Sequence, residues 1–481
     1  MSKFTRYFGI SKAQSELDFV DIELDGDLPL YVDPYALTTR DDDWSIRCQT
    51  LVVSFFEAVL DVIRSGKRKT GITLLSHLGE PEETHLGVSR DGNKGRGIGS
   101  IQAEELYDAL VKSIATTSGL LQDLPDIALF IPGIGRDKIS DMTTNIIRKA
   151  LIEYTQMQCK LLGISMQHVP SGFLWDPDKG KWTQEYVDLP ICNGEKIILI
   201  PKYTVRYQVG VDHATYRSKF VLEFLKAEHL RADDALVTAI KNKKGEITKK
   251  VVHKKTVDDY YPKDKEFLAK FSAENPKIVE DYRESLKLLA SKIPDIGSGE
   301  VTERDLAAHL AANLKDIPPG FKSANNYHNL IIGIISFIYF PNLIYPQKEA
   351  EINEGRKRID ITYTNGKDFG FFYRIAIDQD IKANIVHVEC KNYSNDIANP
   401  EFDQLIGRFD RTRGRLGLLF YRKSEGQAEV IRRCRDAAKS GLGIILPIDD
   451  EFVLKALQFI EQGKRDHIDR QIDELFRNVT A

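Results

Sequence analysis

Three charged residues in the C-terminal part of the chain have the types and the order needed to hydrolyse a phosphodiester bond. Asp360 lies in GRKRIDITY, and Glu389 and Lys391 lie in the later segment IVHVECKNY. Two carboxylates can hold Mg²⁺ while leaving it free to bind water and phosphate oxygens, and a neighbouring ammonium can orient the water or neutralise the phosphate. We therefore expect Asp360 and Glu389 to bind Mg²⁺ or Mn²⁺, with Lys391 as the catalytic cation.

The segments that carry these residues are expected to be strands. Because side chains alternate between the faces of a strand, Glu389 and Lys391 share one face and Cys390 points away, which leaves the Cys390 backbone carbonyl as a further metal ligand. The alternative is that the three residues are ordinary surface charges with weak salt bridges. A Glu-x-Lys at the end of a buried strand argues against that alternative, because charges near apolar neighbours are costly unless something compensates them.

A helix is expected to begin at Asn399, a good N-cap residue before Pro400. On that helix Gln404 and Arg408 are four positions apart and hence on one face. We expect Gln404 to form hydrogen bonds near the metal and Arg408 to contact a phosphate.

The order of Asp and a later Glu-x-Lys resembles the motif of the restriction endonuclease-like, or PD-(D/E)XK, nuclease superfamily. The resemblance spans residues 325–447, where a buried helix at 327–340 is followed by strands, a helix, a strand at 416–421, a helix at 425–438 and a strand at 443–447. It implies an α-β-β-β-α-β core with a mixed sheet, and magnesium-dependent cleavage of DNA. Many members carry a carboxylate on the first helix. This chain has Asn325, Asn326 and His328 there, and Glu349 or Glu351 from the first strand could replace the missing ligand.

Further residues are expected to contact DNA because they are basic or amide side chains near the motif or in the Lys-rich segment 241–255. They are Arg356, Arg358, Asn392, Arg411, Arg413, Lys249 and Lys250. For the Lys-rich segment the first interpretation is a solvated face or loop, and contact with the DNA backbone is the alternative.

Two features of the first half carry open alternatives. The glycine-rich loop containing Gly95 and Gly97 leads into a helix and could hold phosphate, or it is a plain loop without a Walker motif. Asp137, Ser140 and Asp141 lie at the start of a helix expected to run towards Cys159, where capping is favoured over a second polar site. Strands are expected at GITLLSHL, LPDIALF and KIILIPKYTVRY, and helices at 46–65, 101–114, 221–240 and 265–292.

The whole chain has the composition of a soluble globular protein. It has 481 residues, 42% hydrophobic and 29% charged, with a net charge of -4, which neither requires nor excludes nucleic acid. Five scattered cysteines indicate reduced thiols, and the absence of a signal peptide or a long apolar run predicts a cytoplasmic protein without membrane contact. We expect an N-terminal mixed α/β domain (1–200), a helical Lys-rich connector (201–300) and a nuclease-like domain (301–481).

The sequence therefore predicts a Mg²⁺-dependent DNA endonuclease. By resemblance, such a chain looks like a bacterial restriction or anti-phage effector that acts as a homo-oligomer, a dimer or higher, with an N-terminal sensing half. The main alternative is a module that binds nucleic acid on a nuclease-like fold without cutting it. A third possibility is a separate enzymatic activity in the N-terminal half.

Overall fold

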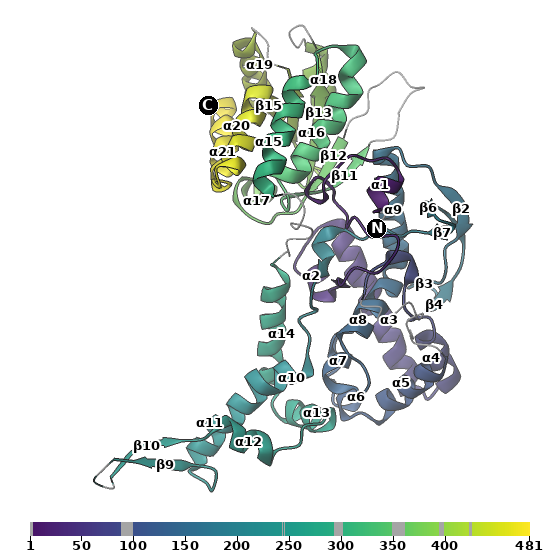
Figure 1. The fold of residues 1–481 in the computed structure, drawn as a ribbon, viewed down its shortest axis with the longest axis vertical. Helices are drawn as coiled ribbons and strands as arrows, with labels where there is room; N and C mark the ends of the chain where they lie inside the picture. Colours follow the sequence, from purple (N-terminus) through teal and green to yellow (C-terminus); the bar gives the residue numbers. More distant parts are fainter. Residues whose placement is uncertain are drawn as a thin grey trace.

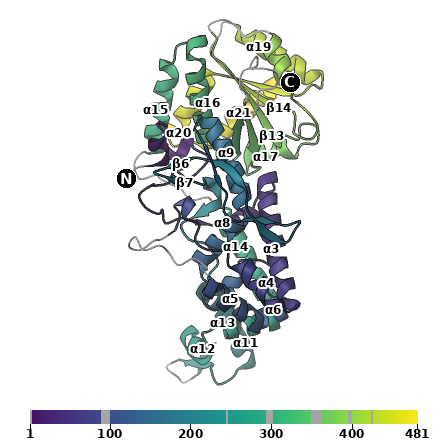
Figure 2. The same ribbon diagram turned by 90° about the vertical axis from the view of Figure 1, so that its right-hand side faces the viewer.

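The C-terminal domain, an α/β domain within residues 302–481, lies at one end of an elongated molecule (Figure 1). The computed structural model describes residues 3–87, 100–242, 244, 246–292, 302–348, 361–393, 399–422 and 426–481. A mainly helical N-terminal body, within residues 3–211, lies in the middle, and an arm, within residues 213–292, forms the other end. Figure 2 shows the same order along the long axis from a direction at right angles. The expected mixed α/β class is confirmed.

The N-terminal body combines helices with short two-stranded sheets. Its helices are α1 (Phe4–Tyr7), α2 (Pro34–Thr38), α3 (Asp43–Arg64), α4 (Arg68–Leu75), α5 (Ser100–Lys112), α6 (Ile114–Thr117), α7 (Asp126–Phe130), α8 (Arg136–Ile146) and α9 (Arg148–Leu162). Its antiparallel strand pairs are β1 (Tyr31–Val32) with β8 (Val205–Arg206), β2 (Gln167–Pro170) with β5 (Tyr186–Leu189), β3 (Leu174–Asp176) with β4 (Lys181–Thr183), and β6 (Ile191–Cys192) with β7 (Glu195–Lys196).

Two of the strands expected in this region are wrong and a third is mostly wrong. GITLLSHL lies largely in α4, and LPDIALF contains α7. In KIILIPKYTVRY only Lys196, the last residue of β7, and the two residues of β8 belong to strands, and residues 197–200 are buried without forming one. A short apolar run shows that a segment is buried, but it does not distinguish a helix from a strand, because tertiary packing decides between them.

The arm continues the core of the body and ends in an exposed hairpin. Its elements are α10 (His213–Tyr216), the π-helical η4 (Arg217–Val221), α11 (Leu222–Ala232), β9 (Thr238–Lys241), β10 (Ile247–Val251), α12 (Lys254–Tyr260), α13 (Lys265–Glu274) and α14 (Pro276–Ala290). The helix expected at 221–240 ends at Ala232, because Asp233 takes the left-handed conformation that terminates it. Leu268 and Tyr282 belong to the same hydrophobic cluster as Phe19, so the arm and the body share one core.

The C-terminal domain is built on a five-stranded mixed sheet. Its elements are α15 (Glu303–Asp316), the 3-10 turn η5 (Phe321–Ser323), α16 (Ala324–Ile338), β11 (Leu343–Lys348), β12 (Ile361–Asn365), α17 (Gly370–Ile377), β13 (Ile385–Lys391), α18 (Asn399–Ile406), β14 (Leu416–Tyr421), α19 (Gln427–Lys439), β15 (Ile444–Asp449), α20 (Asp450–Glu461) and α21 (Asp466–Thr480). The strand order is β11-β12-β13-β14-β15.

The pairing of these strands follows from their sequences. β11, β12 and β13 pair antiparallel, whereas β13, β14 and β15 pair parallel. β14 and β15 are buried along their whole length, as expected for parallel strands covered by helices on both faces. The expected strand at 416–421 and the helix and strand types expected around it are confirmed.

The edge strand β11 is anchored in the N-terminal body. Its residue Tyr345 is part of the core of that body, and its amide donates to Asp18 Oδ1 at 3.2 Å. Tyr154 on α9 donates to the other oxygen of Asp18 at 2.8 Å, and Tyr345 contacts the hydroxyl of Tyr203. The sheet of the C-terminal domain is therefore held by the N-terminal body through buried polar contacts. Within the described parts of the chain, no helix has both the length and the apolar character to cross a membrane.

Candidate active site

Glu389 and Lys391 form a buried ion pair at the end of the central strand β13. The side chains lie on one face of the strand, as the alternation predicts, and Lys391 Nζ is 2.5 Å from Glu389 Oε1. Both residues are almost inaccessible, with 2% and 3% of their surface exposed. A buried carboxylate and a buried ammonium persist together because each compensates the charge of the other.

Arg408 approaches the same carboxylate from beyond the end of α18. The helix ends at Ile406, so the expected placement of Arg408 on its surface is wrong, yet Arg408 Nη1 lies 3.4 Å from Glu389 Oε2. Gln404 lies on α18 with a half-buried side chain. Glu389 thus has one cation at each carboxylate oxygen.

Two glycines allow the segment that carries Arg408 to approach the sheet closely. A Cβ atom at Gly417 on β14 would lie 2.5 Å from Leu405 Cδ2, and one at Gly443 would collide with the ring of Phe409. Leu405 and Phe409 flank Arg408, so any larger residue at either glycine would push the arginine away from Glu389. The glycines act on the site through packing.

His328 on α16 lies near Glu389, Lys391 and Lys348, the last on β11. Burial lowers the pKa of His328 to about 4, while the charge of Glu389 raises it and those of Lys348 and Lys391 lower it. Helix α16 therefore brings an imidazole near Glu389, on the helix where the resemblance implied a carboxylate. Lys348 was not among the site residues predicted from the sequence. The pattern that could have indicated it is a lysine at the end of an apolar strand.

Asn392 has a structural role instead of the expected contact with DNA. Its side chain is buried, and Nδ2 donates to the carbonyls of Pro318 at 3.1 Å and Gly320 at 2.9 Å. Its backbone carbonyl accepts from the Gly320 amide at 2.7 Å, and its Oδ1 accepts from Arg422 at 3.3 Å. These bonds attach the loop between α15 and α16 to the end of β13.

The other expected DNA contacts in the described residues lie away from Glu389. The Arg413 carbonyl accepts from the Ile385 amide, which puts Arg413 and the exposed Arg411 at the opposite end of β13, about 13 Å along the strand. Lys249 and Lys250 lie on β10 in the hairpin at the far end of the molecule (Figure 1), where Lys250 pairs with Asp233. They do not extend the surface around Glu389.

In the N-terminal body, capping by Ser140 and Asp141 is wrong. The helix expected to run to Cys159 is divided at Ile147 into α8 and α9, and α8 begins at Arg136. Ser140 Oγ accepts from the Val32 amide at 2.9 Å, and the Tyr31 hydroxyl donates to Asp137.

Asp141 lies inside α8 among other acidic side chains. Burial and the charges of Glu80 and Asp137 raise the pKa of Asp141 to about 7, although Lys138 opposes them. Asp137 and Asp141 are therefore close neighbours. The acidic cluster lies in the N-terminal body, outside the Glu389 site.

Several expected site residues lie outside the described residues. They are Asp360, Glu349, Arg356, Arg358, Gly95 and Gly97. Among the residues that the structure describes, no group of three or more His, Cys, Asp or Glu side chains is arranged to hold a metal ion.

A polar cleft of about 830 Å³ separates the C-terminal domain from the N-terminal body. Its walls are residues 9–12 with Glu16, the end of α9 at Leu161–Gly163, and the facing sides of α15 and α16, and both His328 and Lys348 line it. A second hollow of about 720 Å³ shares residues 9–12, Glu16 and His309 with the first and continues it towards Arg6. We call the two together the interdomain groove.

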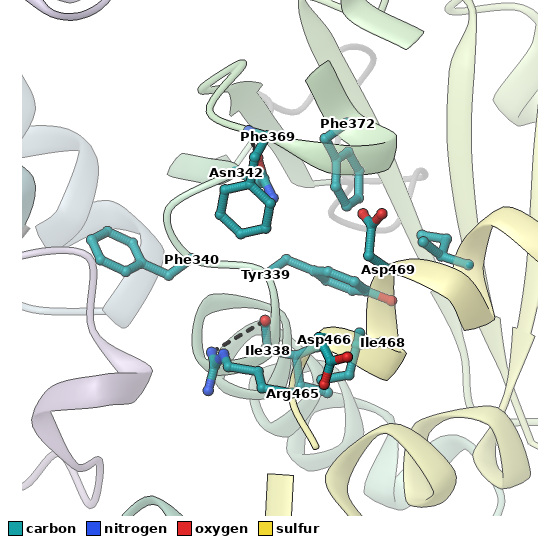
Figure 3. Close-up of a pocket in the computed structure, with 11 residues that line it drawn as sticks. Ile338, Tyr339, Phe340, Asn342, Phe369, Phe372, Arg465, Asp466, Ile468 and Asp469 are labelled. Atoms are coloured by element: carbon teal, nitrogen blue, oxygen red, sulfur yellow. Dashed lines mark hydrogen bonds between the residues drawn. The ribbon is translucent and has the colours of Figure 1, made fainter. Parts of the chain in front are cut away.

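A separate hollow of about 280 Å³ lies within the C-terminal domain, between the end of α16, α17 and α21. Figure 3 shows Tyr339 and Phe372 in its middle, with Asp469 beside them and Arg465 donating to the Ile338 carbonyl. Asp469 Oδ1 is engaged by the Phe371 amide at 2.7 Å. This hollow contains none of the residues expected to act in catalysis.

The chain is thus a mixed α/β protein whose C-terminal sheet carries a buried Glu-Lys-Arg cluster. A family described as a domain of unknown function (DUF8370) matches residues 9–211, which cover most of the N-terminal body and exclude Glu389 and Lys391. No curated protein and no solved structure matches the chain.

Proposed function

We propose that the chain is a divalent-metal-dependent nuclease that hydrolyses DNA at the end of β13. The observation that carries the proposal is the buried Glu389–Lys391 pair, with 2.5 Å between Nζ and Oε1, at the end of the central strand of a five-stranded mixed sheet. Charged groups buried at that position are costly for folding, and phosphodiester chemistry gives each of them a use.

The order of the elements supports a restriction endonuclease-like core. Helix α16 is followed by β11, β12 and β13, then by α18 and β14, which matches α-β-β-β-α-β with α17 inserted between β12 and β13. The antiparallel start and the parallel continuation of the sheet agree with a mixed sheet.

The residues at the site fit a hard divalent cation. Glu389 supplies a carboxylate and Cys390 a backbone carbonyl, and Mg²⁺ takes oxygen ligands and often uses only one or two protein carboxylates. The proposal assigns the second carboxylate to Asp360, and requires that the antiparallel ladder of β12 and β13 extends by one pair beyond Ile361 and Val388. When bound, Mg²⁺ or Mn²⁺ would activate water and stabilise charge on the phosphate.

The cations of the site have separate roles in this proposal. Lys391, held by Glu389, orients the attacking water or neutralises the phosphate. Arg408 has a planar guanidinium suited to phosphate oxygens, and its longer 3.4 Å contact with Glu389 is the one that substrate would replace.

The N-terminal body has a regulatory role in this proposal, as the sensing half of a restriction or anti-phage effector that works as a homo-oligomer. The support is the anchoring of β11, because Asp18 and Tyr345 connect the body directly to the edge of the sheet. A shift of the body would therefore be transmitted to the strands that carry the site.

The test is cleavage of supercoiled plasmid DNA by the full chain in Mg²⁺, in Mn²⁺ and in EDTA. We expect nicked or linear products only with metal, and a rate about 100-fold lower for Lys391→Ala and for Asp360→Asn. Lys439→Ala changes an exposed lysine at the end of α19 and serves as the matched control. Full cleavage by Lys391→Ala would show that the proposal is wrong.

The second candidate is a nucleic-acid-binding module that does not cut. It is favoured by one observation, that both oxygens of Glu389 are already engaged by protein cations. Tight DNA binding in EDTA together with no product in any divalent metal would select this candidate.

A further inference from the structure

Phe321 is exposed, with 81% of its surface accessible, and it lies in the turn whose flanking residues Pro318 and Ser323 line the interdomain groove. It opens the turn η5, and Ser323 at the end of the same turn lines the groove. Single exposed apolar residues are common on protein surfaces, so the exposure alone has no functional meaning. Phe321 differs from such residues because its turn borders the groove and is fixed to the end of β13 by hydrogen bonds.

The loop that presents Phe321 is attached to the strand that carries Lys391. Gly320, the residue before Phe321, exchanges hydrogen bonds with Asn392, the residue after Lys391, at 2.7 and 2.9 Å. Gly320 has a φ of +120°, a conformation that suits glycine and turns the chain outward. The turn that carries Phe321 is thus attached to the end of β13, directly after Lys391.

The interdomain groove beside Phe321 offers groups that recognise nucleotides. Asn325, Asn326 and Asn329 on α16 line it, and a side-chain amide both donates and accepts hydrogen bonds, as base edges do. Lys348 lies at one end of the groove and Arg6 at the other. Asp316 and Glu16 also line it, and Glu16 is paired with Lys12 at 3.6 Å.

We infer that the interdomain groove binds an unpaired polynucleotide strand, and that Phe321 stacks on one of its bases next to the scissile phosphate. The inference rests on the proposed nuclease function and names its substrate class. A base can stack on a protein ring only when it leaves its own helical stack, so the aromatic platform selects unpaired strands. The cleft of about 830 Å³ has the volume of a pocket for a small ligand, a size that suits individual nucleotides of an unpaired strand.

The test measures binding by the full chain in EDTA, where a metal-dependent nuclease does not cut. Fluorescence anisotropy is recorded with a labelled oligothymidylate of about 20 nucleotides, with oligouridylate, and with a blunt duplex of the same length. We expect the unpaired strands to bind at least about 10-fold more tightly than the duplex, and the DNA and RNA arms to show which sugar is preferred.

Variants locate the binding. Phe321→Ala is expected to weaken binding of the unpaired strand by about 10-fold, whereas Phe321→Trp retains it because the platform is preserved. Phe369→Ala is the matched control, since Phe369 is 54% exposed on the same domain and lines the separate hollow near α17. Lys348→Ala is expected to weaken binding and to reduce its salt dependence.

The outcomes separate this inference from the proposed function. Preference for the unpaired strand that depends on Phe321, without cleavage in any metal, supports the groove and contradicts the nuclease. Metal-dependent cleavage with equal affinity for the duplex, or with unchanged binding by Phe321→Ala, overturns the inference and leaves the nuclease intact.

Discussion

Arg408 reaches Glu389 from a turn that begins after α18 has ended, with 3.4 Å between Nη1 and Oε2. The contact gives the carboxylate a second cation in addition to Lys391. It also places a guanidinium where a phosphate bound at this site would meet it.

Arg408→Ala is expected to lower the rate of DNA cleavage by about 100-fold, because the transition state loses a cation that binds phosphate oxygens. Lys391 still compensates Glu389, so the free energy of unfolding should fall by about 1 to 3 kcal/mol, the cost of one hydrogen bond to a buried charged group. Arg408→Lys should recover part of the rate, because lysine restores the positive charge but lacks the planar guanidinium that can donate two parallel hydrogen bonds to a phosphate. Initial rates on plasmid DNA measure the change in cleavage, and urea unfolding measures the change in the free energy of unfolding. An Arg408→Ala rate equal to wild type would exclude the arginine from the reaction.

Gly417→Ala is expected to lower the free energy of unfolding by about 1 to 3 kcal/mol, because its Cβ overlaps Leu405. The added methyl should also shift Arg408 and slow cleavage. Leu405→Ala in the same chain should relieve the overlap and recover part of the stability, which a double-mutant cycle would detect. Gly135→Ala is the control, since a Cβ there meets open space and its φ of -112° suits any residue. Additive effects of Gly417→Ala and Leu405→Ala would contradict this packing argument.

Asn392→Ala is expected to weaken binding of unpaired strands although Asn392 is buried. The substitution removes the donors to the Pro318 and Gly320 carbonyls and so frees the loop that presents Phe321. We expect faster hydrogen exchange across residues 317–323 and a loss of about 2 kcal/mol in the free energy of unfolding. Asn478→Ala changes an exposed asparagine on α21 and should alter neither quantity. Unchanged exchange in the loop would show that other contacts hold it.

Asp141→Asn is expected to stabilise the protein at pH 8 by roughly 2 kcal/mol and to have little effect at pH 4. Burial and the charges of Glu80 and Asp137 raise the pKa of Asp141 to about 7, above its usual value of 3.8. Between these values the folded state binds more protons than the unfolded state, so the stability contributed by protonated Asp141 is present below pH 4 and is lost as the pH rises towards 7. Urea unfolding across this range measures the effect. Asp137→Asn, at the exposed neighbour, should give a smaller change.

Asp18→Asn is expected to lower the free energy of unfolding by about 3 kcal/mol, because Asp18 anchors β11 in the N-terminal body. Burial lowers the pKa of Lys202 to about 8 while the charge of Asp18 opposes that shift, so removing the charge of Asp18 leaves a buried ammonium uncompensated. Adding Lys202→Met should restore much of the stability, because an apolar side chain of similar length needs no partner. Thermal unfolding of the two variants compares them directly. If both were equally unstable, the loss would come from the hydrogen bonds of Tyr154 and Tyr345 instead.

The C-terminal elements could be predicted from the sequence because charged and glycine-containing segments mark their ends, as RTRGR and RKSEG do around residues 416–421. Residues 416–421 form a strand with the expected bounds, and alternation alone places Glu389 and Lys391 on one face of β13. The same reasoning failed in the N-terminal body, where the short runs GITLLSHL and LPDIALF lie in helices. A run of a few apolar residues carries too little periodicity to separate a helix from a strand.

By itself, the sequence determined the residue types available for chemistry and the strand that pairs Glu389 with Lys391, since both follow from local order along the chain. Only the tertiary structure decided which distant residues join them. Arg408 reaches Glu389 because Gly417 on β14 and Gly443, just before β15, let its segment approach the sheet, and Asn392 holds the Phe321 loop. Such contacts depend on how elements far apart in sequence pack together, and packing is a property of the whole fold.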